Sequence, residues 1–183
     1  MNTLTTNMGS TTVAFDGLIF AVDKGCWARN GGSWSSVTKL QEIQTSARQK
    51  LGLGSGVNAW IAMVGELGFC LRVREWLTDR IEVAPVADNK NELIAVIVSS
   101  EAKVYLLTGW YSLVKIDSVP FAEGSAHEMV LGAMLAGAKA PMAIALAARR
   151  SAGIAAGIDY VTIANGEFGG IQFDHRFTEQ KMM

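Results

Sequence analysis

The order of strand and helix patterns along the 183 residues is the feature that most constrains the fold. Alternating and β-branched stretches predict strands in the first third, a hairpin near the middle and a hairpin near the end, with helices between these blocks. Such blocks indicate two sheets with helices on their outer faces. The predicted strands cover Thr11–Phe15, Leu18–Asp23, Val37–Ile43, Ala59–Val64, Leu93–Ser99, Lys103–Thr108, Ile158–Ala164 and Gly170–Phe173, and the predicted helices cover Gly65–Thr78, Ala126–Ala136 and Pro141–Ala152.

Three local signals mark where elements end. Gly137 predicts a left-handed helix cap, Pro141 suits the first turn of a helix, and Asn165-Gly166 predicts a type I′ hairpin turn. The helices on either side of Gly137 carry few charges and many alanines, and the second is apolar nearly all round. One sheet face cannot cover so much apolar surface, so we expect contact with a second subunit, with deep burial in a monomer as the alternative.

Composition sets the size and the class of the protein. A chain of 183 residues buries roughly 70 per cent of its unfolded surface, which is enough for one domain. It has no run of about 18 apolar residues and no basic-then-apolar leader, which predicts a soluble, cytoplasmic protein that does not enter a membrane. The net charge of -1 and the lack of a basic stripe argue against nucleic acid as a partner. Cys26 and Cys70 form neither a disulfide framework nor a metal signature, so we expect no metal and no cofactor.

Ser10 is a candidate nucleophile because it follows Gly9 just before the first predicted strand. If the Gly9–Ser10 bond is cut, Ser10 carries both a hydroxyl and a free α-amine that can act as its base. The ordinary pKa of an α-amine, about 7.7 to 8.0, leaves a useful neutral fraction near neutral pH, so no histidine is needed. The alternative is that Ser10 only begins a strand after a frayed polar terminus.

Short motifs follow one another along most of the chain. They are Ser10-Thr11-Thr12-Val13, Leu18 to Asp23, Thr38-Lys39-Leu40-Gln41-Glu42-Ile43, Trp60-Ile61-Ala62-Met63-Val64-Gly65-Glu66 and Glu123-Gly124-Ser125-Ala126-His127. Their order resembles the β-subunits of the proteasome and the peptidase subunit of the bacterial two-component ATP-dependent protease. In those proteins a propeptide that ends in glycine is removed to free an N-terminal threonine in a Thr-Thr-x-Val strand.

The resemblance implies a role for each matched residue. Ser10 would be the nucleophile. Asp23 would hold Lys39 charged, and Lys39 would assist the hydroxyl and keep the amine neutral. The backbone N–H of Ala62 would form the oxyanion hole, and Ser125 would orient the amine. The alternative for Asp23 and Lys39 is a surface ion pair.

The resemblance also implies the architecture. It predicts the N-terminal nucleophile hydrolase fold, an α+β four-layer αββα sandwich of two mostly antiparallel sheets. Residues 1–9 would be a propeptide and residues 10–183 one proteasome-like domain. The stretch 80–92 has no room for a second long helix, which we expect to be short or missing. The chain departs from the proteasomal pattern in its serine nucleophile and in having Ser151 and Ile154 in place of an aspartate and a serine.

The predicted function is that of a self-processing, threonine-type endopeptidase, with serine as nucleophile, that cuts peptide bonds inside a ring of its own copies. Its partners would be unfolded polypeptides and an ATP-dependent unfoldase. Two other functions stay open. One is a catalytically silent ring or scaffold subunit, and the other is an N-terminal nucleophile amidohydrolase that acts on a small amide.

Overall fold

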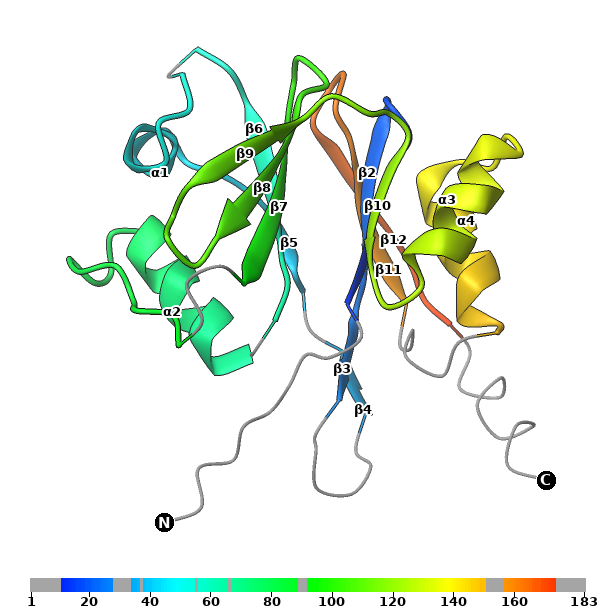
Figure 1. Ribbon diagram of the computed structural model, residues 1–183, viewed down its shortest axis with the longest axis horizontal. Coiled ribbons are helices and arrows are strands. Elements are labelled where there is room, and N and C mark those ends of the chain that lie inside the picture. The colour runs from blue at the N-terminus through cyan, green and yellow to red at the C-terminus, as the bar shows by residue number, and fades with distance from the viewer. Residues whose placement is uncertain are drawn as a thin grey trace.

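The computed structural model describes residues 11–27, 34–36, 38–54, 56–65, 67–88, 92–150 and 157–173. In this part of the chain two five-stranded antiparallel sheets face one another, and helices cover the outer face of each (Figure 1). The predicted α+β four-layer αββα sandwich is therefore confirmed. None of the described helices is long and apolar enough to cross a membrane. They are α1 (Thr45–Lys50), α2 (Leu67–Leu77), α3 (His127–Leu135) and α4 (Ala140–Ala148).

The first sheet holds the beginning of the chain near its centre. Its strand order is β10-β1-β2-β11-β12, so the N-terminal hairpin lies between the strand that precedes α3 and the C-terminal hairpin. Helices α3 and α4 pack on its outer face (Figure 1). Its strands are β1 (Thr12–Phe15), β2 (Ile19–Asp23), β10 (Phe121–Gly124), β11 (Ile158–Thr162) and β12 (Glu167–Ile171).

The second sheet follows the order of the chain, β5-β6-β7-β8-β9, and α1 and α2 pack on its outer face. A separate two-stranded ribbon extends beyond the two sheets (Figure 1). The sheet consists of β5 (Leu40–Glu42), β6 (Ala59–Met63), β7 (Leu93–Ser99), β8 (Val104–Thr108) and β9 (Leu113–Ile116), and the ribbon of β3 (Gly25–Trp27) and β4 (Trp34–Ser36).

The core between the sheets is apolar from both sides. Phe15 and Phe20 of the first sheet and Trp60 and Val96 of the second are at most 2% exposed. The opposite face of β1 is also covered, because Ala14 packs under α3 and α4. This double burial explains why β1 is a continuous apolar run and not an alternating one. The buried polar side chains of β1 and β2 are Thr12, at the start of β1, and Asp23, at the end of β2, and the candidate site lies at that end of the sheet.

The ends of α3 and α4 follow the predicted signals. Gly137, just after α3, has a φ of 97°, the left-handed conformation that glycine adopts at no steric cost. Helix α4 begins with Ala140-Pro141, and the N–H of Ala140 donates to Asp16 Oδ2 at 2.9 Å. The turn of the first hairpin therefore caps a helix that lies far along the chain.

Two further expectations concern connections. Residues 78–88, all described, contain no helix, so the second long helix is missing there as expected. The C-terminal hairpin forms, but the predicted type I′ turn is wrong. Residues 163–166 connect β11 to β12, and of these four only Gly166 has a positive φ, 70°. The Gly166 N–H donates to the Thr162 carbonyl and closes a longer turn than the dipeptide signal predicts.

Candidate functional site

Three polar side chains meet at one end of the sandwich. Thr11 precedes β1, Asp23 ends β2, and Lys39 precedes β5. The Lys39 Nζ lies 3.0 Å from Thr11 Oγ1 and 3.3 Å from Asp23 Oδ2. The side chains of Lys39 and Asp23 are 1% and 0% exposed. The fold thus brings a hydroxyl, an ammonium and a carboxylate from three segments into one buried cluster.

Asp23 accepts hydrogen bonds on both carboxylate oxygens. Its Oδ1 accepts from the Thr12 N–H at 2.6 Å, and its Oδ2 accepts from the Gly25 N–H at 2.9 Å and from Lys39. An ionised carboxylate only accepts, so these donors suit the charged form. Burial raises the pKa of Asp23 above its ordinary value, and the Lys39 charge and the two N–H groups offset part of that rise. The two residues form a buried pair and not the surface ion pair considered as the alternative.

The hydroxyl beside Lys39 belongs to Thr11, which is 6% exposed. The predicted nucleophile Ser10 and the predicted cleavage site after Gly9 lie outside the described residues, so both stay predictions. Thr11 is not among the residues predicted from the motifs. The signal available in the sequence was the pair Thr11-Thr12. This pair matches the first two residues of the Thr-Thr-x-Val motif when the motif is placed one residue later in the chain.

Ser125 lies near Thr11 at the end of the β1–β10 pair. The last paired residues are Thr12 of β1 and Gly124 of β10. Thr11 precedes Thr12 and Ser125 follows Gly124, so both lie at the same end of this strand pair. Gly124 has a φ of 107°, and a Cβ at this position would overlap the carbonyl oxygen of Thr11. Only glycine permits this approach. Ser125 is exposed, and its action on the amine stays a prediction.

Ala62 does not direct its N–H toward this cluster. It pairs with Leu40 of β5 on one side and Val96 of β7 on the other. Two residues further on, the N–H of Val64 donates to Ile94 of β7 at 2.9 Å. Backbone groups of alternate residues in an antiparallel ladder face the same neighbouring strand, so the Ala62 N–H also faces β7. The oxyanion hole at Ala62 therefore stays a prediction that this geometry does not support.

One residue outside the predicted site also belongs to this region. His127 begins α3, and its Nδ1 lies 2.8 Å from the Gly124 carbonyl oxygen. This contact depends on the turn between β10 and α3, which no hydrophobic pattern predicts. Among the described residues no group of three or more His, Cys, Asp or Glu side chains could hold a metal ion. The chemistry that this part of the chain offers is that of hydroxyl, ammonium, carboxylate and imidazole.

The layers define a type of fold. Two facing antiparallel sheets with helices on both outer faces form a sandwich like that of the N-terminal nucleophile hydrolases. In this sandwich the polar cluster lies where the first strand begins. Sequence comparison finds no matching protein family and no matching curated protein. The similarity to known proteins therefore lies in the fold.

Three of the solved structures similar to this chain are of Anbu proteins. Anbu (ancestral beta-subunit) from Yersinia bercovieri has a TM-score of 0.60 and 12% identity, covering 93% of this chain and 90% of that one. Anbu from Hyphomicrobium sp. strain MC1 has a TM-score of 0.59 and 12% identity, covering 93% and 91%. The helical assembly of the Anbu complex from Pseudomonas aeruginosa has a TM-score of 0.60 and 12% identity, covering 94% and 91%. At this identity the similarity shows the fold alone.

These matches correct the family expected from the motifs. The motifs resemble the proteasome β-subunits and the bacterial peptidase subunit, whereas the three similar structures described above are of Anbu proteins, which are proteasome-like but distinct. The expected assignment was therefore wrong. The motifs behind this assignment are short. They lie at strand ends and at a glycine turn, which are features of the sandwich fold in general. Such features do not separate one family with this fold from another.

Proposed function

We propose that the chain is an N-terminal nucleophile peptidase subunit in which Thr11 is the nucleophile. The observation that carries this proposal is the 3.0 Å contact between Lys39 Nζ and Thr11 Oγ1. Lys39 and Asp23 are both buried, and buried ions are costly to desolvate. A buried ion pair that serves stability alone can often be replaced by apolar side chains without loss of stability. The position of Lys39 and Asp23 beside the Thr11 hydroxyl suits a role in catalysis instead.

In the first step the chain cuts itself before Thr11. The Thr11 Oγ attacks the carbonyl carbon of Ser10, the peptide nitrogen leaves as the Thr11 amine, and the acyl group remains on Oγ as an ester. Water then hydrolyses this ester and residues 1–10 are released. The product carries a free α-amine beside the Thr11 hydroxyl, so nucleophile and base belong to one residue.

In turnover Thr11 Oγ attacks the carbonyl of a substrate peptide bond. The α-amine accepts the hydroxyl proton, directly or through a water, and gives it to the leaving amine. Lys39 stabilises negative charge on the attacking oxygen and disfavours protonation of the nearby amine. Water hydrolyses the acyl ester and restores the hydroxyl. Unfolded polypeptides are the proposed substrates, and an ATP-dependent unfoldase remains a predicted partner.

Three variants at adjacent hydroxyls test this assignment with a fluorogenic peptide. Thr11→Ala should lower hydrolysis at least about a thousandfold, because it removes the nucleophile. Ser10→Ala should keep hydrolysis near the wild-type rate. Thr12→Val is the matched control, since Thr12 Oγ1 is buried without a hydrogen-bond partner, and it should also keep hydrolysis. If Ser10→Ala abolishes hydrolysis and Thr11→Ala does not, Ser10 is the nucleophile and the Thr11 assignment is wrong.

A catalytically silent scaffold subunit is the second candidate function. It is favoured by the orientation of the Ala62 N–H toward β7, which leaves the cluster without the predicted oxyanion donor. A silent subunit would hydrolyse no peptide and would keep residues 1–10. The wild-type protein and Thr11→Ala would then behave alike, which separates this function from the first.

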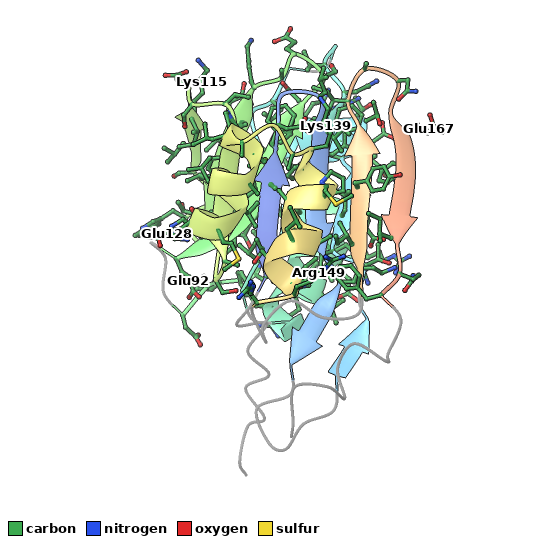
Figure 2. The ribbon with its side chains drawn as sticks, turned by 90° about the vertical axis from the view of Figure 1, so that its right-hand side faces the viewer. Glu92, Lys115, Glu128, Lys139, Arg149 and Glu167 are labelled. Carbon is green, nitrogen blue, oxygen red and sulfur yellow. The ribbon has the colours of Figure 1, made fainter. Side chains whose placement is uncertain are left out.

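We also propose that copies of the chain associate through α3 and α4. Figure 2 faces these helices, with Lys139 and Arg149 at the two ends of α4. Between them is an apolar surface, and exposed apolar patches rimmed by charge are typical of interfaces. One of the similar structures is described as a helical assembly of the Anbu complex, which agrees with self-association. The large apolar side chains on this surface, between 41% and 70% exposed, are Met129, Leu135, Met142 and Leu146.

A further inference from the structure

His127 makes a hydrogen bond whose direction can be deduced. Its Nδ1 lies 2.8 Å from the carbonyl oxygen of Gly124, three residues earlier. A carbonyl oxygen only accepts, so Nδ1 must carry the proton. His127 is exposed at the first residue of α3, and Ala126 at the N-cap makes no side-chain hydrogen bond there. The imidazole therefore links the beginning of α3 to the end of β10 through a hydrogen bond.

The N–H and the carbonyl of Gly124 each make a hydrogen bond to a side chain. Its N–H donates to Glu123 Oε1 at 3.3 Å, and its carbonyl accepts from His127. Gly124 is also the residue whose backbone lies against the Thr11 carbonyl and pairs with Thr12. A rotation of the Gly124 carbonyl would turn the planar peptide that leads into Ser125. The position of Ser125 near Thr11 thus depends on the hydrogen bond from His127.

We propose that His127 is a positioning residue for peptide hydrolysis. By donating from Nδ1 to the Gly124 carbonyl, it fixes the Gly124–Ser125 segment against the residue that carries the nucleophile. This inference rests on the proposed function of Thr11. The hydrogen bond of His127 goes to the Gly124 carbonyl and not to the Thr11 hydroxyl, so the proposal places its effect on the rate of the chemical step and not on substrate binding.

Three substitutions at position 127 separate the Nδ1 donor from other properties of the imidazole. The side-chain amide nitrogen of asparagine occupies the position of Nδ1, whereas that of glutamine lies one bond further out. His127→Ala and His127→Gln should therefore lower kcat for a fluorogenic peptide about tenfold with little change in KM, as expected for one lost hydrogen bond. His127→Asn should restore kcat to within about twofold of the wild-type value. If His127→Asn has the same kcat as His127→Ala and His127→Gln, the proposal is overturned.

Two controls accompany these variants. Glu128→Gln changes the exposed neighbouring side chain and should leave kcat unchanged, and thermal unfolding should show that each variant is folded. Nitrogen NMR of the labelled imidazoles gives a readout that does not depend on activity, and the His127→Asn spectrum identifies the signals of His127 against those of His175. A neutral ring protonated on Nδ1 supports the proposal, and one protonated on Nε2 overturns it. If the wild-type protein hydrolyses no peptide, the proposed function fails and the positioning role fails with it, while the NMR result still decides whether the hydrogen bond exists.

Discussion

At the residue scale, the account depends on which hydroxyl reaches Lys39. The segment Ser10-Thr11-Thr12-Val13 fits a Thr-Thr-x-Val pattern when serine replaces the first threonine, and a shift by one residue keeps both threonines but loses the valine. The sequence could not decide between these alignments, because the contact depends on where the ends of two sheets meet. Asp23 and Lys39 could be selected in advance, because each falls on a position of the motifs that resemble those of the proteasome β-subunits.

The buried carboxylate of Asp23 should make the stability of the protein depend on pH. Burial raises the pKa of Asp23 above 3.8, so the folded chain holds this proton more tightly than the unfolded chain does. Its contribution to the free energy of unfolding is complete below pH 3.8 and is lost as the pH rises through the folded-state pKa. The free energy of wild type minus that of Asp23→Asn, measured by urea denaturation, should therefore fall with rising pH in this window. A difference that increases with pH would contradict the raised pKa.

At the scale of elements, long apolar patterns were predictable and short elements were not. The strands from β6 to β8 and the helices α2, α3 and α4 lie where periodicity places them. Helix α1 is too short, at six residues, for a helical period to show. Strand β9 has two exposed central residues, and β10 contains glycine and glutamate, so neither alternates. Strand β5 covers three residues of the longer strand predicted there, although Lys39 and Ile43 on either side of it still make backbone hydrogen bonds to β6.

The turn after β10 predicts opposite effects for two glycine substitutions. Gly124→Ala should destabilise the protein by about 2 kcal/mol or more, because φ is 107° and a Cβ would overlap the Thr11 carbonyl. Gly132→Ala in α3 is the matched control, since a Cβ there meets nothing within 4 Å. It should stabilise the protein by about 0.5 to 1 kcal/mol through helix propensity. Denaturant unfolding measures both, and equal effects would refute the close approach at Gly124.

At the scale of the whole molecule, the order of strand blocks and helices was enough to predict the sandwich. Each sheet packs one apolar face against the other sheet and its opposite face against a pair of helices. The family could not be predicted in the same way, because motifs at strand ends are shared by proteins of this shape. The apolar outer surface of α3 and α4 was visible in composition, since few charges occur between Ala126 and Ala148.

The same surface predicts how assembly responds to a charge. Leu135 is 70% exposed on α3, and Leu135→Glu should reduce self-association, because an interface would have to bury the carboxylate. Val83→Glu is the matched control at a side chain that is 78% exposed near α2, and it should leave assembly unchanged. Light scattering at equal protein concentration compares the two. Assembly that survives Leu135→Glu would show that the copies meet elsewhere, and a wild-type protein that is already a monomer would contradict self-association altogether.

The first residue of the purified protein, determined by intact-mass measurement, tests the central claim most directly. We predict a wild-type chain that begins at Thr11, and full-length chains for Thr11→Ala and Lys39→Met, because the first lacks the attacking oxygen and the second lacks the ammonium 3.0 Å from it. A mature wild-type chain that begins at Ser10, or a wild-type chain that keeps residues 1–10, would contradict the account.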